Sequence, residues 1–301
     1  MNSVHAYPPQ ILRFAAWNQR FVYHSKKRLN WYGRVPGKCI GMCRFCQCSI
    51  HWREGRGLET LDYHDLLAKL GEGSAHPGGF TATVQLIDSL SLPERGQVLE
   101  VGCGTGRTAC YLARNGYRVT AIDLHRQMLE KAVRRARRER LDIRFIQADV
   151  TALPFPDHQF DVVFVESVTI FTRWRAALSE YKRVLKPGGR LIDREMVLSG
   201  RKTELMSRRL KHFYGMRTLA TMTVWKKRLK QCGFTRVLVR EHSRSMGKWG
   251  VDHDPHRELD MALFEDEQVR RMSETNDQLL ARYGKRLGYA VFDAKVPPDE
   301  R

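Results

Sequence analysis

The stretch that decides the fold is Gln97-Val98-Leu99-Glu100-Val101-Gly102-Cys103-Gly104-Thr105-Gly106. It reads as a short apolar strand followed by three glycines, and the amphipathic segment Arg107 to Asn115 comes next. Glycines at such a strand-to-helix turn allow a tight bend and a close approach of backbone to a ligand. The N-terminus of the following helix offers free N–H groups to an anion, either a phosphate or a carboxylate.

Downstream of Gly96 the sequence alternates short apolar strands with longer amphipathic helices. Strands are expected at Gln97 to Val101, Arg118 to Ile122, Ile143 to Gln147, Phe160 to Glu166, Gly189 to Glu195, Arg236 to Arg240 and Tyr289 to Lys295. Helices are expected at Arg107 to Asn115, His125 to Arg140, Trp174 to Leu185, Val224 to Cys232 and Asp260 to Tyr283. This alternation predicts an α/β fold whose parallel sheet is covered by helices on both faces.

The composition changes near residue 75. Residues 1–75 are rich in aromatic and basic side chains and show little periodicity until a short amphipathic helix, expected at Leu58 to Leu70. A loop rich in Gly and Pro follows, and helical spacing resumes at Thr81 to Leu90. We therefore predict an irregular N-terminal extension over residues 1–75 and a main domain over residues 76–301.

The totals exclude several classes of protein. A chain of 301 residues with 42% hydrophobic content can bury a core, and seven cysteines are too few for a disulfide scaffold. The first residues lack a secretory signal and no apolar run spans a bilayer, so a cytoplasmic location away from membranes is expected. The formal charge of +19 favours encounters with polyanions, although much of the Arg excess falls on what look like solvated helix faces.

Acidic residues stand at the ends of three expected strands. Asp123 ends the second strand, where a carboxylate can accept both hydrogens of a ribose diol. Asp149 follows the third strand, where it can accept from an adenine amine while the N–H of Val150 donates to the ring. Glu166 ends the fourth strand, at the carboxyl edge where open α/β folds bind ligands.

These motifs together resemble the class I, type 11-like methyltransferases that use S-adenosylmethionine. The similar segments are Val98 to Gly106, Asp123, Asp149, Leu153 to Phe155, Phe160 to Val163 and Val184 to Gly189. The resemblance spans roughly residues 79–295 and implies a Rossmann-like sheet of seven strands, the last one antiparallel between the fifth and sixth. It also implies cofactor contacts from Glu100, Gly102, Gly104, Gly106, Asp123, Asp149 and Val150.

Two residues are candidates for the acceptor side. Glu166 is expected to contact the substrate or take its proton, or merely to cap the next segment. His76 precedes Pro77-Gly78-Gly79 in a segment that either closes over the pocket or forms only a turn. Methyl transfer is a direct displacement at a sulfonium, so positioning and exclusion of water can supply most of the catalysis and a base is optional.

The N-terminal extension contains a cluster of cysteines at Cys39, Cys43, Cys46 and Cys48. The spacing of the first three resembles the cluster motif of radical S-adenosylmethionine enzymes, but the βα barrel that normally surrounds that motif does not fit here. A closed zinc site with His51 nearby, a non-radical iron-sulfur cluster, buried small side chains and a thiol surface for a soft metalloid all remain open. Cys103, Cys110 and Cys232 are interpreted as packing residues.

Three functions follow from this sequence. The first is a methyltransferase for a small-molecule acceptor, with segments around Leu205 to Met222 and Asp260 to Tyr283 forming a cap over the carboxyl edge. The second is an RNA methyltransferase that uses its basic surface, although no recognised RNA-binding module is present. The third is a non-catalytic sensor that binds S-adenosylmethionine or a metal.

Overall fold

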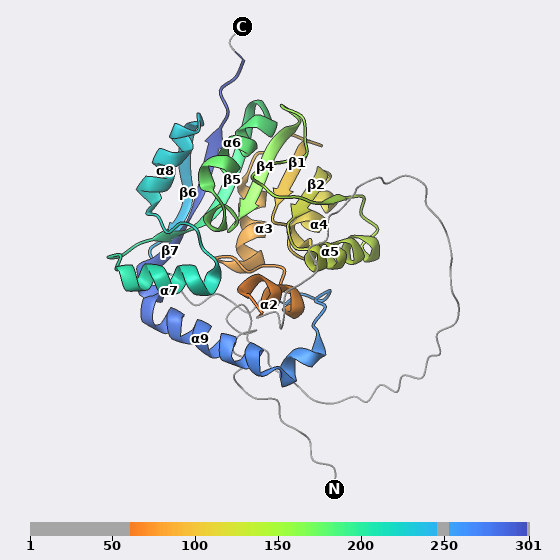
Figure 1. The fold of residues 1–301 in the computed structure, drawn as a ribbon. Helices are drawn as coiled ribbons and strands as arrows, with labels where there is room; N and C mark the ends of the chain where they lie inside the picture. The colour runs from red at the N-terminus through yellow and green to blue at the C-terminus, as the bar shows by residue number, and fades with distance from the viewer. Residues whose placement is uncertain (1–60, 246–252, 300–301) are drawn as a thin grey trace, which may run out of the picture. The chain divides into compact units, whose positions relative to one another are not determined.

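The computed structural model describes residues 61–245 and 253–299, which form one seven-stranded sheet flanked by helices (Figure 1). The strands are β1 (Gln97–Val101), β2 (Arg118–Asp123), β3 (Arg144–Gln147), β4 (Phe160–Glu166), β5 (Leu185–Leu198), β6 (Thr235–Ser243) and β7 (Leu287–Lys295). Their order across the sheet is β3-β2-β1-β4-β5-β7-β6, and β7 pairs antiparallel with both β5 and β6. The predicted α/β class and the antiparallel last strand are confirmed.

Two helices precede the first strand, and six more lie in connections between later strands within the described residues. They are α2 (Tyr63–Leu70), α3 (Gly79–Ser89), α4 (Arg107–Arg114), α5 (Arg126–Arg138), α6 (Trp174–Val184), α7 (Glu204–Tyr214), α8 (Met222–Gln231) and α9 (Glu267–Tyr283). Short 3₁₀ turns are η1 (Thr169–Phe171), η2 (Met261–Glu265) and η3 (Gly284–Arg286).

Successive residues of the central strands enter two different cores, one on each face of the sheet. Val98 of β1 and Val162 of β4 pack with apolar residues of α3, α4 and α5. Leu99 and Val163, one position further along the same strands, pack with residues of α2 and α6 to α9. Both faces are thus covered, which explains why these strands are continuously apolar rather than alternating.

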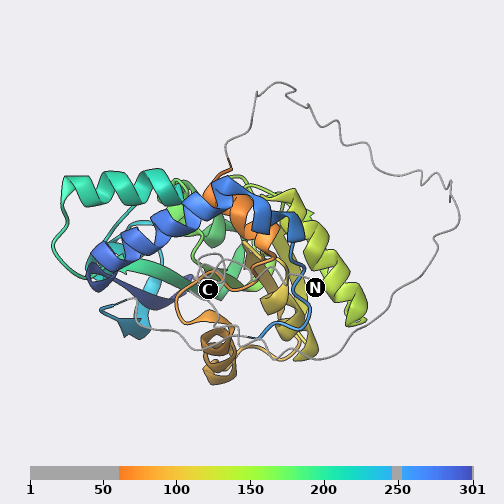
Figure 2. The same cartoon turned by 90° about the horizontal axis from the view of Figure 1, so that it is seen from below.

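A cap of helices lies at the carboxyl edge of the parallel strands. Figures 1 and 2 show α2, α7 and α9 together at this edge, below the sheet in the first view. Aromatic contacts join α2 and α7, since Tyr63 of α2 contacts Phe213 and Tyr214 of α7 at centroid distances of 5.9 and 4.9 Å. The hydroxyl of Tyr214 donates to Asn276 of α9 at 2.8 Å, so the three helices form one packed unit.

Several expected boundaries differ from those in the structure, most clearly at the last helix and at β5. The helix expected at Asp260 to Tyr283 is interrupted at Asp266, whose side chain accepts from the N–H of Gln268 and starts α9 after the short turn η2. Strand β5 is longer at both ends than the expected Gly189 to Glu195, because Leu185 pairs with β4 at one end and the pairing with β7 continues to Leu198 at the other.

The predicted division at residue 75 stays a prediction, because residues 1–60 lie outside the described part of the chain. Of the preceding segment, the structure describes α2, whose Leu66 and Leu70 are buried in the same core as the sheet.

Candidate functional site

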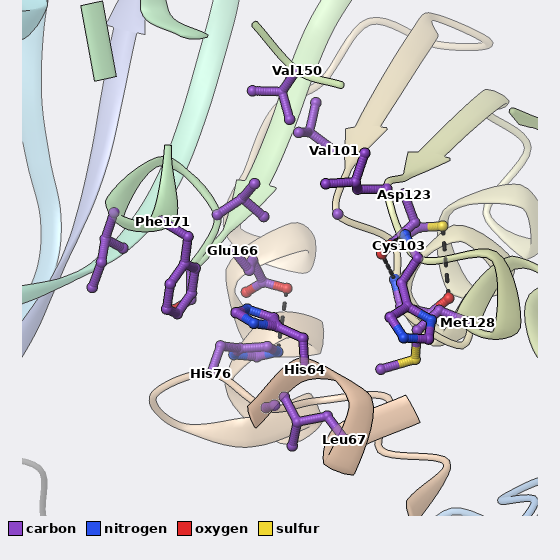
Figure 3. A pocket seen from close by; sticks show the side chains of 18 of the residues that line it. His64, Leu67, His76, Val101, Cys103, Asp123, Met128, Val150, Glu166 and Phe171 are labelled. Atoms are coloured by element: carbon purple, nitrogen blue, oxygen red, sulfur yellow. Dashed lines mark hydrogen bonds and ion pairs between the residues drawn. The ribbon is translucent and has the colours of Figure 1, made fainter. Parts of the chain in front are cut away.

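A cavity of about 550 Å³ opens at the carboxyl edge of the sheet, between the strand tips and α2. Its wall includes six of the seven residues predicted to contact a cofactor: Glu100, Gly102, Gly104, Asp123, Asp149 and Val150. The seventh, Gly106, does not line the cavity and instead precedes the first turn of α4. His76 and Glu166 also line the cavity, so the structure brings the predicted residues together (Figure 3).

The glycine turn has a geometry that requires glycine. Gly102 has φ +70, and a Cβ at this position would lie 2.3 Å from Cγ2 of Val168. Gly106 has φ +76, and its Cβ would lie 2.8 Å from Cβ of Ala132 on α5. The glycines therefore allow β1, α4 and the loop after β4 to meet at the cavity.

Glu100 is a buried carboxyl group with an unmet hydrogen-bonding capacity. Burial raises its pKa well above the usual value, and the nearby carboxylates of Glu166 and Asp123 raise it further. Among the described residues, its Oε2 atom has no hydrogen-bond partner. Because a buried carboxylate without a partner is costly, this atom is suited to accept a hydrogen bond from a cationic ligand group such as an ammonium.

Asp123 is fixed by the backbone on both sides. Its Oδ2 accepts from the N–H of Gly104 and its Oδ1 from the N–H of His125, each at 2.8 Å. Burial raises the pKa of Asp123, while these two backbone N–H groups oppose that rise. Each oxygen keeps a further acceptor site, so the carboxylate is oriented to accept from two hydroxyl groups.

Asp149 and Val150 form the adjoining wall. The Oδ1 atom of Asp149 accepts from both the N–H and the hydroxyl of Thr151 at 2.8 Å, and this carboxylate is exposed. Val150 is buried. Val150 offers an apolar surface suited to the face of a purine ring. Asp149 offers a hydrogen-bond acceptor suited to its edge.

His76 and Glu166 lie together on the other side of the cavity. The Nε2 atom of His76 is 3.4 Å from Oε2 of Glu166 and 3.3 Å from the hydroxyl of Thr83, and its Nδ1 is 3.4 Å from the carbonyl of Pro77. Burial lowers the pKa of His76, and the charge of Glu166 opposes that shift. Both ring nitrogens thus already have protein neighbours.

Glu166 is held by a residue that sequence reasoning missed. Arg194, from β5, is fully buried, and its Nε donates to Oε1 of Glu166 at 2.9 Å. The other guanidinium nitrogens donate to the carbonyls of Pro77 and Ala82 at 3.2 and 3.1 Å. Glu166 and Arg194 therefore tie the segment around His76 to the sheet, and neither is free to move.

A second missed feature is the segment 253–260, which is hydrogen-bonded to the end of α2. Asp254 forms a buried ion pair with Arg135 of α5 at 2.6 Å, and Arg257 pairs with the buried Glu72 at 2.9 Å. Glu72 lines the cavity, so this segment fixes part of the wall from outside. Nothing in the spacing of these residues indicates that they meet, because they are more than a hundred residues apart in the chain.

His64 is a third feature that sequence reasoning missed. It lies in the first turn of α2 and lines the cavity, with its ring edge-on to Phe171 at 4.7 Å. The helix itself was expected, but amphipathic spacing gives the buried side of a helix and not which of its residues faces a cavity.

The predicted metal ligands Cys39, Cys43, Cys46 and Cys48 lie outside the described residues. In the ranges that the structure describes, no group of three or more His, Cys, Asp or Glu side chains is arranged to hold a metal ion. Cys103 and Cys110 are buried and Cys232 is half-buried, all as free thiols. Within the same ranges, no helix is long and apolar enough to cross a membrane.

The sheet order, the glycine turn and the acids at the strand tips define a Rossmann-like fold, a class in which nucleotide ligands bind at the carboxyl edge of the sheet. A family model described as a methyltransferase domain matches residues 99–193. The chain is 33% identical over 232 residues to the uncharacterized methyltransferase YodH of Bacillus subtilis (strain 168), covering 77% of this chain and 98% of that protein. The chain belongs to the class I S-adenosylmethionine-dependent methyltransferases.

Other similar proteins have named acceptors. The chain is 29% identical over 176 residues to phosphoethanolamine N-methyltransferase 1 of Zea mays, covering 58% of this chain and 35% of that protein. The solved structure of Haemonchus contortus phosphoethanolamine N-methyltransferase 2, with phosphomonomethylethanolamine and S-adenosylhomocysteine, matches with a TM-score of 0.61 at 19% identity. That match covers 77% of this chain and 57% of the other, and it shows a shared fold.

Proposed function

We propose that this methyltransferase acts on a small molecule held in the cavity beneath α2. The observation that carries the proposal is the cavity itself. A volume of about 550 Å³ lies within the range of small-molecule sites, and it extends from the strand tips to the aromatic and apolar residues of the cap.

One end of the cavity suits the methyl donor. Glu100 would accept from the ammonium of its methionine part, Asp123 from the ribose hydroxyls, and Asp149 with Val150 would hold the adenine. S-adenosylmethionine supplies a methyl group on a positively charged sulfur, so the buried carboxylates also favour its charge.

The other end suits the acceptor. Leu67, Phe171 and Met196 line it with apolar surface, which excludes water and restricts the acceptor to a defined orientation. Glu166 and His76 border this end, and we propose that they act as a positioning pair that shapes the acceptor site. Phosphoethanolamine is the first acceptor to test, because it is the compound named for several of the similar proteins.

The enclosed cavity favours a small molecule over RNA. Two arginines of α5 are also already engaged in ion pairs and are less available to bind RNA phosphates: Arg134 and Arg138 both pair with Glu258, at 2.7 and 2.6 Å. Turnover on a small molecule would also exclude a sensor without activity. Metal binding by the N-terminal cysteines and a cytoplasmic location stay predictions.

The experiment is to incubate the full chain with S-adenosylmethionine and, separately, phosphoethanolamine, ethanolamine and a small-molecule extract of bacterial cells. Mass spectrometry then measures the S-adenosylhomocysteine formed. We expect formation above the acceptor-free rate with at least one addition, and loss of that signal in Asp123→Ala. If no addition raises the rate while the protein still binds S-adenosylhomocysteine, the sensor hypothesis replaces this one.

A further inference from the structure

Three histidines line the cavity, and they differ in what their ring nitrogens contact. Both nitrogens of His76 have protein neighbours, namely Glu166 and Thr83 on one side and the carbonyl of Pro77 on the other. His125 contacts Asp65 through Nε2 at 3.1 Å, and its Nδ1 is fully buried. Within the described residues, neither ring nitrogen of His64 has a hydrogen-bond partner.

The ring of His64 is nevertheless held firmly in place. It packs edge-on against Phe171 of η1 at 4.7 Å and against Tyr63 at 5.6 Å. Figure 3 shows the side chains of His64 and Phe171 together in the wall of the cavity. The contacts fix the ring plane and leave its polar atoms for a ligand.

The electrostatic surroundings favour the neutral imidazole. Burial is the largest effect and lowers the pKa of His64 below its ordinary value of 6.5. The charged and titratable groups that act on the ring come from its own segment and from the end of β2: Asp62, Asp65, Asp123 and His125. The three carboxylates raise the pKa of His64 and His125 lowers it, but burial outweighs the carboxylates and the pKa is lowered overall. At neutral pH, His64 is therefore ready to accept a proton.

We propose that His64 is the general base of the reaction and that the acceptor is a compound with an N–H or O–H nucleophile; this rests on the proposed function. The acceptor nitrogen or oxygen forms a bond to the methyl carbon while the carbon–sulfur bond breaks. The electron pair of that bond stays on sulfur, which becomes neutral. The proton of the acceptor moves to the open ring nitrogen of His64 and then to water.

His76 and Glu166 are less suited to this step. Each would have to give up an existing contact to receive a proton from the acceptor, and Glu166 is also paired with the fully buried Arg194. The same comparison limits the acceptor class. A thioether nucleophile has no proton to give to His64, whereas an amine or a hydroxyl has one.

The first test needs no acceptor. Diethyl pyrocarbonate reacts with an accessible neutral imidazole nitrogen, and peptide mass spectrometry measures the modification of each histidine. With the full chain saturated with S-adenosylhomocysteine at pH 7, we expect His64 to react faster than His76 and His125. Equal or slower reaction of His64 would mean that its nitrogens are not open to the cavity and would overturn the proposal.

The second test uses turnover with the bacterial small-molecule extract as the source of acceptor. We expect His64→Asn to lower the rate by roughly 10²- to 10⁴-fold, the usual contribution of a general base, with unchanged affinity for S-adenosylhomocysteine. The fall of rate toward low pH in the wild type should be absent in His64→Asn, and added imidazole should restore part of its activity. His212→Asn, which removes an exposed histidine of α7, is the matched control and should behave as the wild type.

Wild-type turnover in His64→Asn, or a loss of rate matched by a loss of S-adenosylhomocysteine affinity, would overturn the proposal, since the second result indicates a structural role. Failure of the proposed function is a different result. It would appear as no turnover by the wild type with any extract fraction, and the pyrocarbonate rates would still decide whether His64 has an open nitrogen.

Discussion

The two ends of the cavity are built in different ways. The donor end comes from strand tips and from the turns that follow them, and its backbone N–H groups hold Asp123 in place. The end that we propose for the acceptor is lined by side chains of α2, η1, β5 and the segment after α7. The donor end leaves Oε2 of Glu100 without a partner among the described residues, whereas at the acceptor end Arg194 and Thr83 occupy Glu166. The donor end therefore has a polar atom available for the cofactor. At the acceptor end, Glu166 is already hydrogen-bonded within the protein and contributes to the shape of the site.

The largest expected effect is on the stability of the fold, from a change in the Glu166 network at the acceptor end. Arg194→Met leaves the carboxylate of Glu166 buried without a cation, and we expect the free energy of unfolding to fall by about 3–5 kcal/mol. Urea unfolding of both proteins measures the difference. Arg240→Met is the control, since its partner Asp293 keeps Arg190 at 2.8 Å, and its effect should stay below about 1 kcal/mol. Equal effects of the two changes would show that the Glu166 network does not stabilise the fold.

A smaller effect is expected from a change of Glu100 at the donor end. It concerns the affinity for S-adenosylhomocysteine rather than the stability of the fold. Glu100→Gln keeps the shape of the side chain but removes the charge that would pair with the donor's ammonium. We expect S-adenosylhomocysteine affinity to fall by roughly 10- to 100-fold, as for loss of a charged hydrogen bond. Because the pKa of Glu100 is raised, wild-type affinity should rise as the pH increases and the carboxyl group ionises, and this rise should be weaker in Glu100→Gln. Calorimetry at several pH values measures both, and an identical pH dependence would contradict the assignment.

The smallest effect concerns the support of η1, which borders the acceptor end. Asp193 and Glu195 are buried on β5, and they accept from the hydroxyl and N–H of Thr169 at 3.2 and 2.7 Å. Burial raises the pKa of Asp193 from its ordinary value of 3.8 and raises that of Glu195 further with the help of Asp193.

A raised carboxyl pKa means that the folded state binds more protons than the unfolded state, so this contribution to stability is lost as the pH rises above about 4. We expect Asp193→Asn to reduce that loss, by on the order of 1 kcal/mol between pH 5 and pH 8. Denaturant unfolding at the two pH values checks this. A difference between the pH values that is as large in the variant as in the wild type would show that the pair does not share a raised pKa.

The donor end could be predicted from the sequence because its chemistry is local. Gly102 and Gly104 follow directly after an apolar strand, and Asp123 and Asp149 stand where later strands end. In a parallel sheet the ends of adjacent strands meet, so correct strand positions already bring these residues together. The antiparallel direction of β7 and its place between β5 and β6 followed from the family resemblance.

The acceptor end could not be predicted in the same way. Arg194 lies in β5, where an isolated arginine reads as a solvent-facing residue, and its burial is explained only by distant contacts with Glu166 and with the carbonyls around His76. The orientation of His64 depends on how α2 packs against α7 and η1, which no local pattern specifies. The interruption of the last helix at Asp266 was also missed, because an acid in a charged helical stretch does not look different from its neighbours until its side chain caps a new turn.

The most direct test of the central claim is a calorimetric titration of S-adenosylhomocysteine into the full chain and into Asp123→Ala. The wild type should bind with one site, and the variant should bind at least about 10-fold more weakly, because the carboxylate that would accept from the ribose hydroxyls is gone. Thermal unfolding of the unliganded variant confirms that it is folded. Equal affinity in the two proteins would contradict the placement of the donor at the tips of β1 and β2.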